Sequence, residues 1–266
     1  MQHPPRSPSS PHTIIDAADV GRLRIATRGA HITSWQTANG QERLYMSALS
    51  ATPEAPPVRG GVPICFPQFG TQGSLPKHGF VRDMQWHVDS VRPTGLTMKV
   101  TDNEWSRSVW PYRFALTLSV EMSASSLTCK LTVENHDSVA WSFTGGLHPY
   151  LRVPDSRRAT LVAPGHPRIS EISGSLAEGV MTDDIGPRVD GGATLRLPHG
   201  AIVIEQSKEF VDTVIWNPAD HALKDLPASD RFHFICVEPA AITSPPVVAP
   251  GDAWQGTMVL TTSDDE

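Results

Sequence analysis

Apolar residues at every second position are the feature that most restricts the fold of this chain. This spacing puts the apolar side chains of a β-strand on one face and the polar side chains on the other. The clearest example covers residues 113–121 and is followed, after a turn-like segment at 123–126, by a second one at 127–134. The alternating apolar residues are Phe114, Leu116, Leu118 and Val120, then Leu127, Cys129, Leu131 and Val133. We predict an antiparallel hairpin with one buried face.

Shorter segments with the same pattern recur along the chain and predict an all-β protein. They cover residues 23–27, 31–36, 96–101, 194–197, 201–205, 213–216, 232–237 and 257–261. A chain of 266 residues with this pattern suits one large antiparallel sandwich domain, which we place at 13–262, between a disordered tail at 1–12 and an acidic tail at 263–266. Helices are expected to be few and short, with one over 219–226, where flanking prolines limit its length.

Charge and cysteine content argue against several classes of protein. The net charge of -6 and the pI of about 6.0 do not suit a nucleic-acid partner, which requires a basic face. The three cysteines are widely spaced and include no Cys-x-x-Cys pair, so we expect neither a disulfide framework nor a zinc site.

Residues 1–13 lack the apolar core of a signal peptide, and no apolar run approaches the ~20 residues of a membrane-spanning helix. We therefore expect a cytoplasmic protein with no membrane partner.

A proline- and glycine-rich segment at 51–79 interrupts the strand pattern and is too long for a plain connection. Arg59, Lys77 and Arg82 lie on or beside it. Arginine offers a planar fork of donors and lysine a point charge, so the three cations together would suit a phosphate group. Spacing alone favours the alternative that they are scattered surface charges. No Gly-x-Gly-x-x-Gly or Walker-type loop is present, so no nucleotide cofactor is expected.

His148 and Glu238 are the candidate acid and base. His148 follows two glycines and precedes a proline, and its ordinary pKa of about 6.5 suits a general acid near neutral pH. Glu238 ends an apolar strand and precedes Pro239, where we expect the strand to stop and partial burial to raise the pKa of the carboxyl. The alternatives are a structural histidine at a turn and a solvated strand end.

Asp212 and Trp216 flank another predicted strand. A carboxylate there could bind sugar hydroxyls, and an indole could cover the apolar face of a sugar ring. Trp216 could equally belong to the core, and the usual burial of large aromatic side chains slightly favours that interpretation.

Five ordered motifs resemble the hexose-6-phosphate mutarotases, also called glucose-6-phosphate 1-epimerases, of the wider aldose 1-epimerase group. They are Arg59-Gly-Gly-Val-Pro, His78-Gly-Phe-Val-Arg82, Leu147-His148-Pro-Tyr150, Asp212-Thr-Val-Ile-Trp216-Asn-Pro and Val237-Glu238-Pro239. The likeness runs from about Gly21 to Leu260 and includes a late Pro250-Gly251-x-x-Trp254-x-Gly256 stretch.

The resemblance implies a galactose-mutarotase-like β-supersandwich with no metal or organic cofactor, working on a sugar phosphate as a monomer. It implies His148 and Glu238 as catalytic residues, and substrate-binding positions at Arg59, Lys77, His78, Arg82 and Asp212. Three residues depart from the usual motifs and bear on the choice of substrate: Lys77, Pro149 and Ala240.

The expected reaction is the interconversion of the α and β anomers of a hexose 6-phosphate. Glu238 would take the proton of the anomeric hydroxyl while His148 protonates the ring oxygen, and we expect the two to face one another across a cleft one sugar ring wide. Two alternatives remain at this point. One is a mutarotase of free aldoses, and the other is a non-catalytic carbohydrate-binding or sensing module, which would need neither an acid nor a base.

Overall fold

The protein was analysed as a computed structural model, which describes residues 11–51, 59–166, 171–173 and 182–264. Residues 1–10 of the first expected tail and 265–266 of the second lie outside these residues. The first described strand begins at His12 and the last ends at Ser263, one residue inside each expected tail. Within the described residues no helix is long and apolar enough to cross a membrane.

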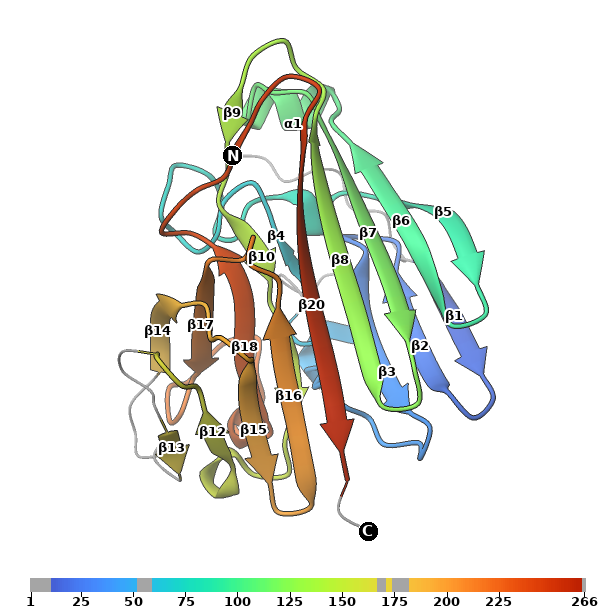
Figure 1. Ribbon diagram of the computed structural model, residues 1–266, viewed down its shortest axis with the longest axis vertical. Helices are drawn as coiled ribbons and strands as arrows, with labels where there is room; N and C mark the ends of the chain where they lie inside the picture. Colours follow the sequence, from blue (N-terminus) through green and yellow to red (C-terminus); the bar gives the residue numbers. More distant parts are fainter. Residues whose placement is uncertain (1–10, 52–58, 167–170, 174–181, 265–266) are drawn as a thin grey trace.

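Two large antiparallel sheets form most of the molecule (Figure 1). The first has nine strands, in spatial order β13 (Glu171–Ser173), β12 (Thr160–Val162), β15 (Ala193–Leu197), β16 (Gly200–Gln206), β20 (Ala253–Ser263), β8 (Ser126–Asn135), β7 (Phe114–Met122), β6 (Gly95–Thr101) and β5 (His87–Arg92). The second has six: β14 (Thr182–Pro187), β17 (Asp212–Asn217), β18 (Phe234–Ala241), β10 (Gly145–Leu147) and β4 (Ile64–Cys65), with β11 (Tyr150–Arg152) also paired to β18.

Smaller elements complete the fold. The strands β1 (His12–Ala17), β2 (Gly21–Ala26) and β3 (His31–Thr37) form a three-stranded sheet, and β9 (Trp141–Ser142) pairs with β19 (Val247–Val248). Short 3-10 helices lie at Ala48–Ala51, Val81–Asp83, Ser156–Arg158 and Asp230–Phe232. The prediction of an antiparallel all-β protein is confirmed.

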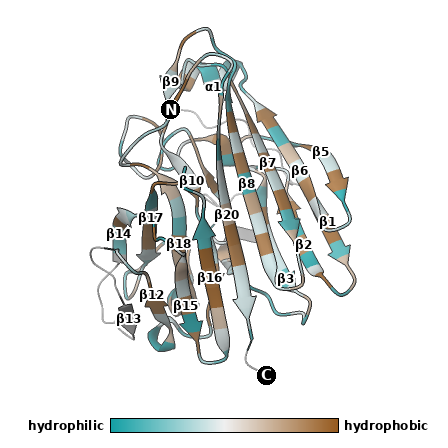
Figure 2. Ribbon diagram, viewed as in Figure 1, coloured by the Kyte–Doolittle hydropathy of each residue, from teal (hydrophilic) through white to brown (hydrophobic). Residues whose placement is uncertain are grey.

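One continuous apolar core joins the sheets. It includes Leu116 and Leu131 from the nine-stranded sheet, Leu147 and Val237 from the six-stranded sheet, and Trp35 from the three-stranded sheet. Figure 2 shows hydrophobic and hydrophilic residues alternating along β7 and β8, as period-two strands with one buried face require. Full burial of an aliphatic side chain stabilises a protein by about 1.5–3 kcal/mol, so this alternation is what directs the sheets to pack face to face.

The predicted hairpin is confirmed as β7 paired with β8, in a register that places Leu118 opposite Leu131. The predicted helix over 219–226 is wrong, because that segment forms turns. Ala219 has a φ of 47°, outside the helical region, and its N–H donates to Oδ1 of Asn217. A helix that the strand pattern did not predict, α1, covers Glu104–Val109, and Asn103 caps its first turn.

The end of the strand that contains Glu238 also differs from the prediction. Pro239 does not stop β18, which continues to Ala241. On one side of this strand, β10 pairs with Ala240 and Ala241, and β11 pairs with residues 234–236. Pro239 therefore lies beside a break in the ladder, where no partner strand needs a backbone N–H from it. Glu238 is consequently in the interior of a central strand rather than at its rim.

Candidate active site

The register of the six-stranded sheet gathers polar side chains on one face. Directly paired residues of antiparallel strands point to the same face, and Asp183 pairs with Trp216, which pairs with Cys236. Cys236 in turn pairs with Tyr150 on the far side of β18. Glu238 lies two residues beyond Cys236 and so shares that face. Residues from four strands therefore line one patch of the sheet.

His148 reaches this patch from the break between β10 and β11. Two glycines precede it because the strands approach too closely for side chains: a Cβ atom on Gly146 would lie 2.5 Å from the carbonyl oxygen of Pro239. The backbone N–H of His148 donates to the carbonyl of Pro63 at 3.0 Å, and the imidazole stacks on the ring of Tyr150 with centroids 4.7 Å apart. The histidine is thus fixed in both backbone and side chain.

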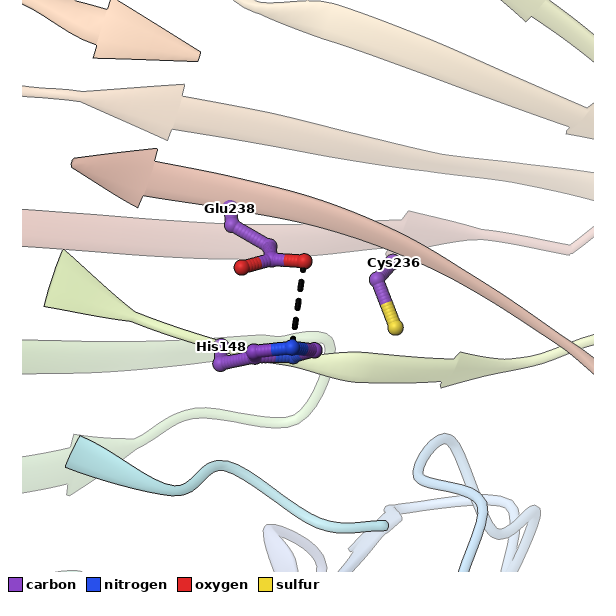
Figure 3. A group of neighbouring side chains, drawn as sticks. All are labelled: His148, Cys236 and Glu238. Atoms are coloured by element: carbon purple, nitrogen blue, oxygen red, sulfur yellow. Dashed lines mark ion pairs between the residues drawn. The ribbon is translucent and has the colours of Figure 1, made fainter. Parts of the chain in front are cut away.

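His148 and Glu238 meet directly. Nε2 of His148 lies 3.3 Å from Oε1 of Glu238, and Figure 3 shows the two side chains pointing toward one another from opposite sides. The expectation that they face each other across a cleft one sugar ring wide is wrong, because no ring fits in this gap. A substrate would have to lie over the pair instead. The second oxygen of Glu238 and Nδ1 of His148 are buried and have no hydrogen-bond partner among the described residues.

Burial shifts the two pKa values in opposite directions. Glu238 is 1% exposed and His148 is 7% exposed. Desolvation raises the pKa of Glu238 well above its ordinary value, and nearby Asp183 raises it further. Desolvation lowers the pKa of His148 well below 6.5, and the positive charges of Arg59 and Arg82 add to this. Both shifts oppose charge on the pair, so burial favours the form in which Glu238 is protonated and His148 is neutral.

His78 lies beside this pair, its ring centroid 5.3 Å from that of His148. Burial lowers the pKa of His78 to about 3, helped by the charges of Arg82, Lys77 and Arg59 in that order. All three predicted cations are therefore close enough to act on one imidazole. Their charges therefore act on the same part of the molecule, and that they bind the substrate stays a prediction.

The three cations are held differently. Arg59 contacts Asp225 through Nη2 at 2.9 Å and donates from Nη1 to the hydroxyl of Tyr150 at 3.3 Å, with its guanidinium 5.2 Å from the ring centroid of Trp216. The charge of Arg59 is thus already countered. Arg82 donates to the backbone carbonyl of Lys77 at 2.7 Å, and within the described part of the chain neither side chain forms an ion pair. The Lys77 side chain is exposed, and its charge acts on the carboxyl of Asp183.

Asp212 occupies a structural position. Its side chain is 1% exposed, and it accepts hydrogen bonds from the backbone N–H groups of Ile242 and Thr243 at 2.6 and 2.8 Å and from the Thr243 hydroxyl. These bonds anchor the chain where it leaves β18. The resemblance implied a substrate contact here, whereas in the structure both carboxylate oxygens of Asp212 accept hydrogen bonds from Ile242 and Thr243.

Several residues of the site were missed or misjudged from sequence. Trp216, for which a core position was slightly favoured, is half-buried at the edge of an apolar cluster and packs against Tyr150 and Phe234. Cys236 shares the period-two face of Glu238, a signal that could have been used. The carboxylates of Asp183 and Asp225 have no local signal in the sequence, since they reach the site only through sheet register and a loop contact.

Three buried side chains of the site could also bind a metal ion. The ligand atoms of His148, Cys236 and Glu238 all lie within 4.8 Å of one another (Figure 3). Nitrogen, sulfur and carboxylate oxygen are the donors that zinc takes in proteins. Burial, however, raises the pKa of the Cys236 thiol well above its ordinary value and opposes the thiolate that a metal requires. That the protein uses no metal stays a prediction.

Comparison with known proteins gives concordant results. Residues 13–175 match the family model described as Aldose 1-epimerase. A candidate glucose-6-phosphate 1-epimerase from Cenchrus ciliaris is 30% identical over 261 residues, which cover 87% of this chain and 78% of that protein.

Among solved structures, a candidate mutarotase from Salmonella typhimurium superposes with a TM-score of 0.80 at 24% identity, covering 94% of this chain and 90% of its own. A galactose mutarotase related enzyme from Lactobacillus acidophilus gives a TM-score of 0.77 at 17% identity, covering 96% and 99%. The predicted galactose-mutarotase-like fold is confirmed.

Proposed function

We propose that this chain, which belongs to the aldose 1-epimerase family, interconverts the α and β anomers of a hexose 6-phosphate. The observation that carries the proposal is the buried contact of 3.3 Å between His148 Nε2 and Glu238 Oε1. Anomer exchange needs a base for the anomeric hydroxyl and an acid for the ring oxygen, and both oxygens are bonded to the same carbon. An acid and a base in contact suit two such neighbouring oxygens.

The proposed reaction moves the single proton of the pair. In the reactive form Glu238 is ionised and His148 is protonated. The free carboxylate oxygen of Glu238 accepts the proton of the anomeric hydroxyl, His148 protonates the ring oxygen, and the bond between the ring oxygen and the anomeric carbon breaks to leave an aldehyde. Rotation about the neighbouring carbon–carbon bond and closure from the other face return both protons. The ring-opened stage has Glu238 protonated and His148 neutral, which is the arrangement that burial favours.

Support for a phosphorylated substrate comes from the cations around His78. Phosphate esters carry nearly two negative charges at neutral pH, and charge-assisted hydrogen bonds are stronger than neutral ones. Since Arg59 is paired with Asp225, we assign the larger role to Arg82 and Lys77. The name of the Cenchrus ciliaris relative agrees with this substrate class.

A mutarotase of free aldoses is the second candidate. The ion pair between Arg59 and Asp225 favours it, because Asp225 already balances the charge of this arginine and no anionic ligand is needed to do so. A non-catalytic binding module is disfavoured. Burying Glu238 Oε2 and His148 Nδ1 without partners is costly to stability, and binding alone gives no reason to retain both.

We further propose that the enzyme acts as a monomer in the cytoplasm. The acid–base pair and the cations around His78 are brought together by the fold of a single chain, so the proposed reaction does not require a partner chain. Cys65, Cys129 and Cys236 are free thiols, which suits a reducing compartment.

The test is the rate of anomer exchange, measured by NMR exchange spectroscopy on glucose 6-phosphate and on glucose. Glu238→Gln keeps the shape of the side chain but removes the base, so the catalysed rate should fall by roughly 10²–10⁴-fold. Glu205→Gln, at an exposed position of β16, is the matched control and should leave the rate unchanged. An undiminished rate in Glu238→Gln would refute the assignment.

A further inference from the structure

We propose that Cys65 is a positioning residue whose thiol holds His78 as the neutral tautomer with its proton on Nε2. His78 then offers a fixed N–H donor to the substrate beside the His148–Glu238 pair. This inference rests on the proposed function for its effect on catalysis, whereas the tautomer itself can be measured without any activity.

The two hydrogen-bond contacts of Nδ1 of His78 identify its tautomer. The backbone N–H of Gly70 points to Nδ1 of His78 at 3.3 Å, and a backbone N–H can only donate. Nδ1 is therefore an acceptor without a proton. The Sγ atom of Cys65 lies 3.2 Å from the same Nδ1, so the thiol must be the donor in that contact. A neutral imidazole has one acceptor and one donor nitrogen, which leaves the proton on Nε2.

The thiol is held in its donating form. Cys65 is 1% exposed, and burial raises the pKa of its thiol far beyond the ordinary value, with a further rise from Glu238. Its position is set by sheet pairing, since Cys65 lies opposite Gly146 in the β10–β4 ladder. The S–H group is thus a permanent donor at a rigid point of the site.

His78 adopts a conformation that local sequence does not favour. Its φ is 64°, in the left-handed region that only a few per cent of non-glycine residues occupy, although histidine enters it more often than most. Such strain persists where the surroundings over-determine it, and it clusters at functional sites. The next residue, Gly79, also has a positive φ, and a Cβ atom there would lie 2.0 Å from the carbonyl oxygen of Phe66. The turn at residues 78 and 79 therefore fixes the direction of the imidazole. Phe69 packs edge-on against it, with ring centroids 5.3 Å apart.

A neutral His78 also matters for its neighbours. The charged or titratable groups that act on it are Arg82, Lys77 and Arg59, with His148 in ring contact. A proton on His78 would place a positive charge beside His148, which must itself become protonated in the reaction. Protonation of Nδ1 would break the hydrogen bonds that it accepts from Cys65 and Gly70. These two donors therefore disfavour the positively charged form of His78.

The experiment uses ¹⁵N-imidazole NMR on the full chain to read the tautomer and pKa of His78 directly. The variants are Cys65→Ala, Cys65→Ser and the control Cys129→Ala, which removes a buried thiol of β8 whose pKa shift comes from burial alone. We expect His78 in the unaltered protein to be neutral with its proton on Nε2 down to pH 5. In Cys65→Ala only the long contact from Gly70 still donates to Nδ1, so a minor tautomer with its proton on Nδ1 should appear and the pKa of His78 should rise by at least about one unit. Cys65→Ser, which restores a donor, should reverse most of the change.

Kinetics supply the second readout. For Cys65→Ala, kcat/KM on glucose 6-phosphate should fall roughly tenfold, the value of one hydrogen bond, and the loss should deepen as pH is lowered from 5 to 4. A proton on Nδ1 in the unaltered protein, or an unchanged His78 spectrum in Cys65→Ala, would overturn the proposal while leaving the epimerase assignment intact. Absence of epimerase activity in the unaltered protein would overturn the proposed function and leave the tautomer result standing.

Discussion

Nε2 of His148 lies 3.3 Å from Oε1 of Glu238, in a part of the molecule where both side chains are almost fully buried. Two groups this close do not titrate independently. Burial opposes charge on each of them, yet moving one proton between them converts a neutral pair into an ion pair without changing the net charge. The pair is therefore best described as one unit that stores a single proton.

The pH dependence of kcat/KM should be a bell in which the singly protonated pair is the active form. Adding a second proton requires a charged His148, whose pKa is lowered, so the acid limb should lie below pH 6.5. Losing the proton requires an ionised Glu238 beside a neutral histidine, and its raised pKa moves the alkaline limb well above 4.5. Rates on glucose 6-phosphate from pH 4 to 10 give both limbs. An acid limb above pH 6.5 would contradict this account.

Arg82→Ala should lower kcat/KM on glucose 6-phosphate by roughly one to two orders of magnitude, because a charge-assisted hydrogen bond contributes about 1.5–3 kcal/mol. Activity on free glucose should scarcely change, and added salt should weaken binding of the phosphate ester more than binding of glucose. Arg196→Ala, at an exposed position of β15, is the control. Equal losses on both substrates would show that Arg82 supports the fold or the sugar ring rather than a phosphate.

Arg59→Ala should behave differently from Arg82→Ala. The guanidinium of Arg59 contacts Asp225, Tyr150 and Trp216, so its removal disturbs the packing of the site as well as its charge. We expect losses on both glucose and glucose 6-phosphate, larger on the ester. Paired kinetics of the two arginine variants measure this contrast, and a purely ester-specific loss for Arg59→Ala would show that its neighbours do not depend on it.

His31 should make the folded state sensitive to acid. Burial lowers its pKa to about 4, while its Nε2 contacts the carbonyl of Gly60 at 2.8 Å. Between pH 6.5 and 4, His31 binds a proton in the unfolded chain but stays neutral in the folded chain. The free energy of unfolding therefore falls as pH falls. The loss by pH 4 is ~3 kcal/mol. Urea titrations at pH 7 and pH 4 measure the free energy of unfolding of the unaltered protein and of His31→Gln. Between the two pH values the variant should lose ~3 kcal/mol less than the unaltered protein.

Treatment with a chelator should leave the epimerase rate unchanged, because the proposed proton transfers need only the His148–Glu238 pair. Added Zn²⁺ should inhibit in competition with substrate, since His148, Cys236 and Glu238 offer it three buried ligand atoms. Cys236→Ser should weaken that inhibition. Loss of activity on chelation that Zn²⁺ restores would instead make the metal part of the reaction.

Local pattern determined much of the architecture. The β7–β8 hairpin follows from alternating residues such as Leu118 and Leu131, because a strand with period two has only one face to bury. The ordered motifs around His148 and Glu238 also pointed to the correct family from sequence alone. Sequence could not tell that β18 runs through Pro239, since that depends on a break in the neighbouring ladder.

Tertiary structure decided which groups meet. The direct contact of His148 with Glu238 and the pairing of Arg59 with Asp225 join residues far apart in the chain, and the committed carboxylate of Asp212 depends on the path of the backbone after β18. Alternation specifies which face a side chain occupies, but the partner across the sheet is set by register and by which loops close over it. Those depend on the packing of the whole core, and so do the burial and the opposite pKa shifts of the acid–base pair.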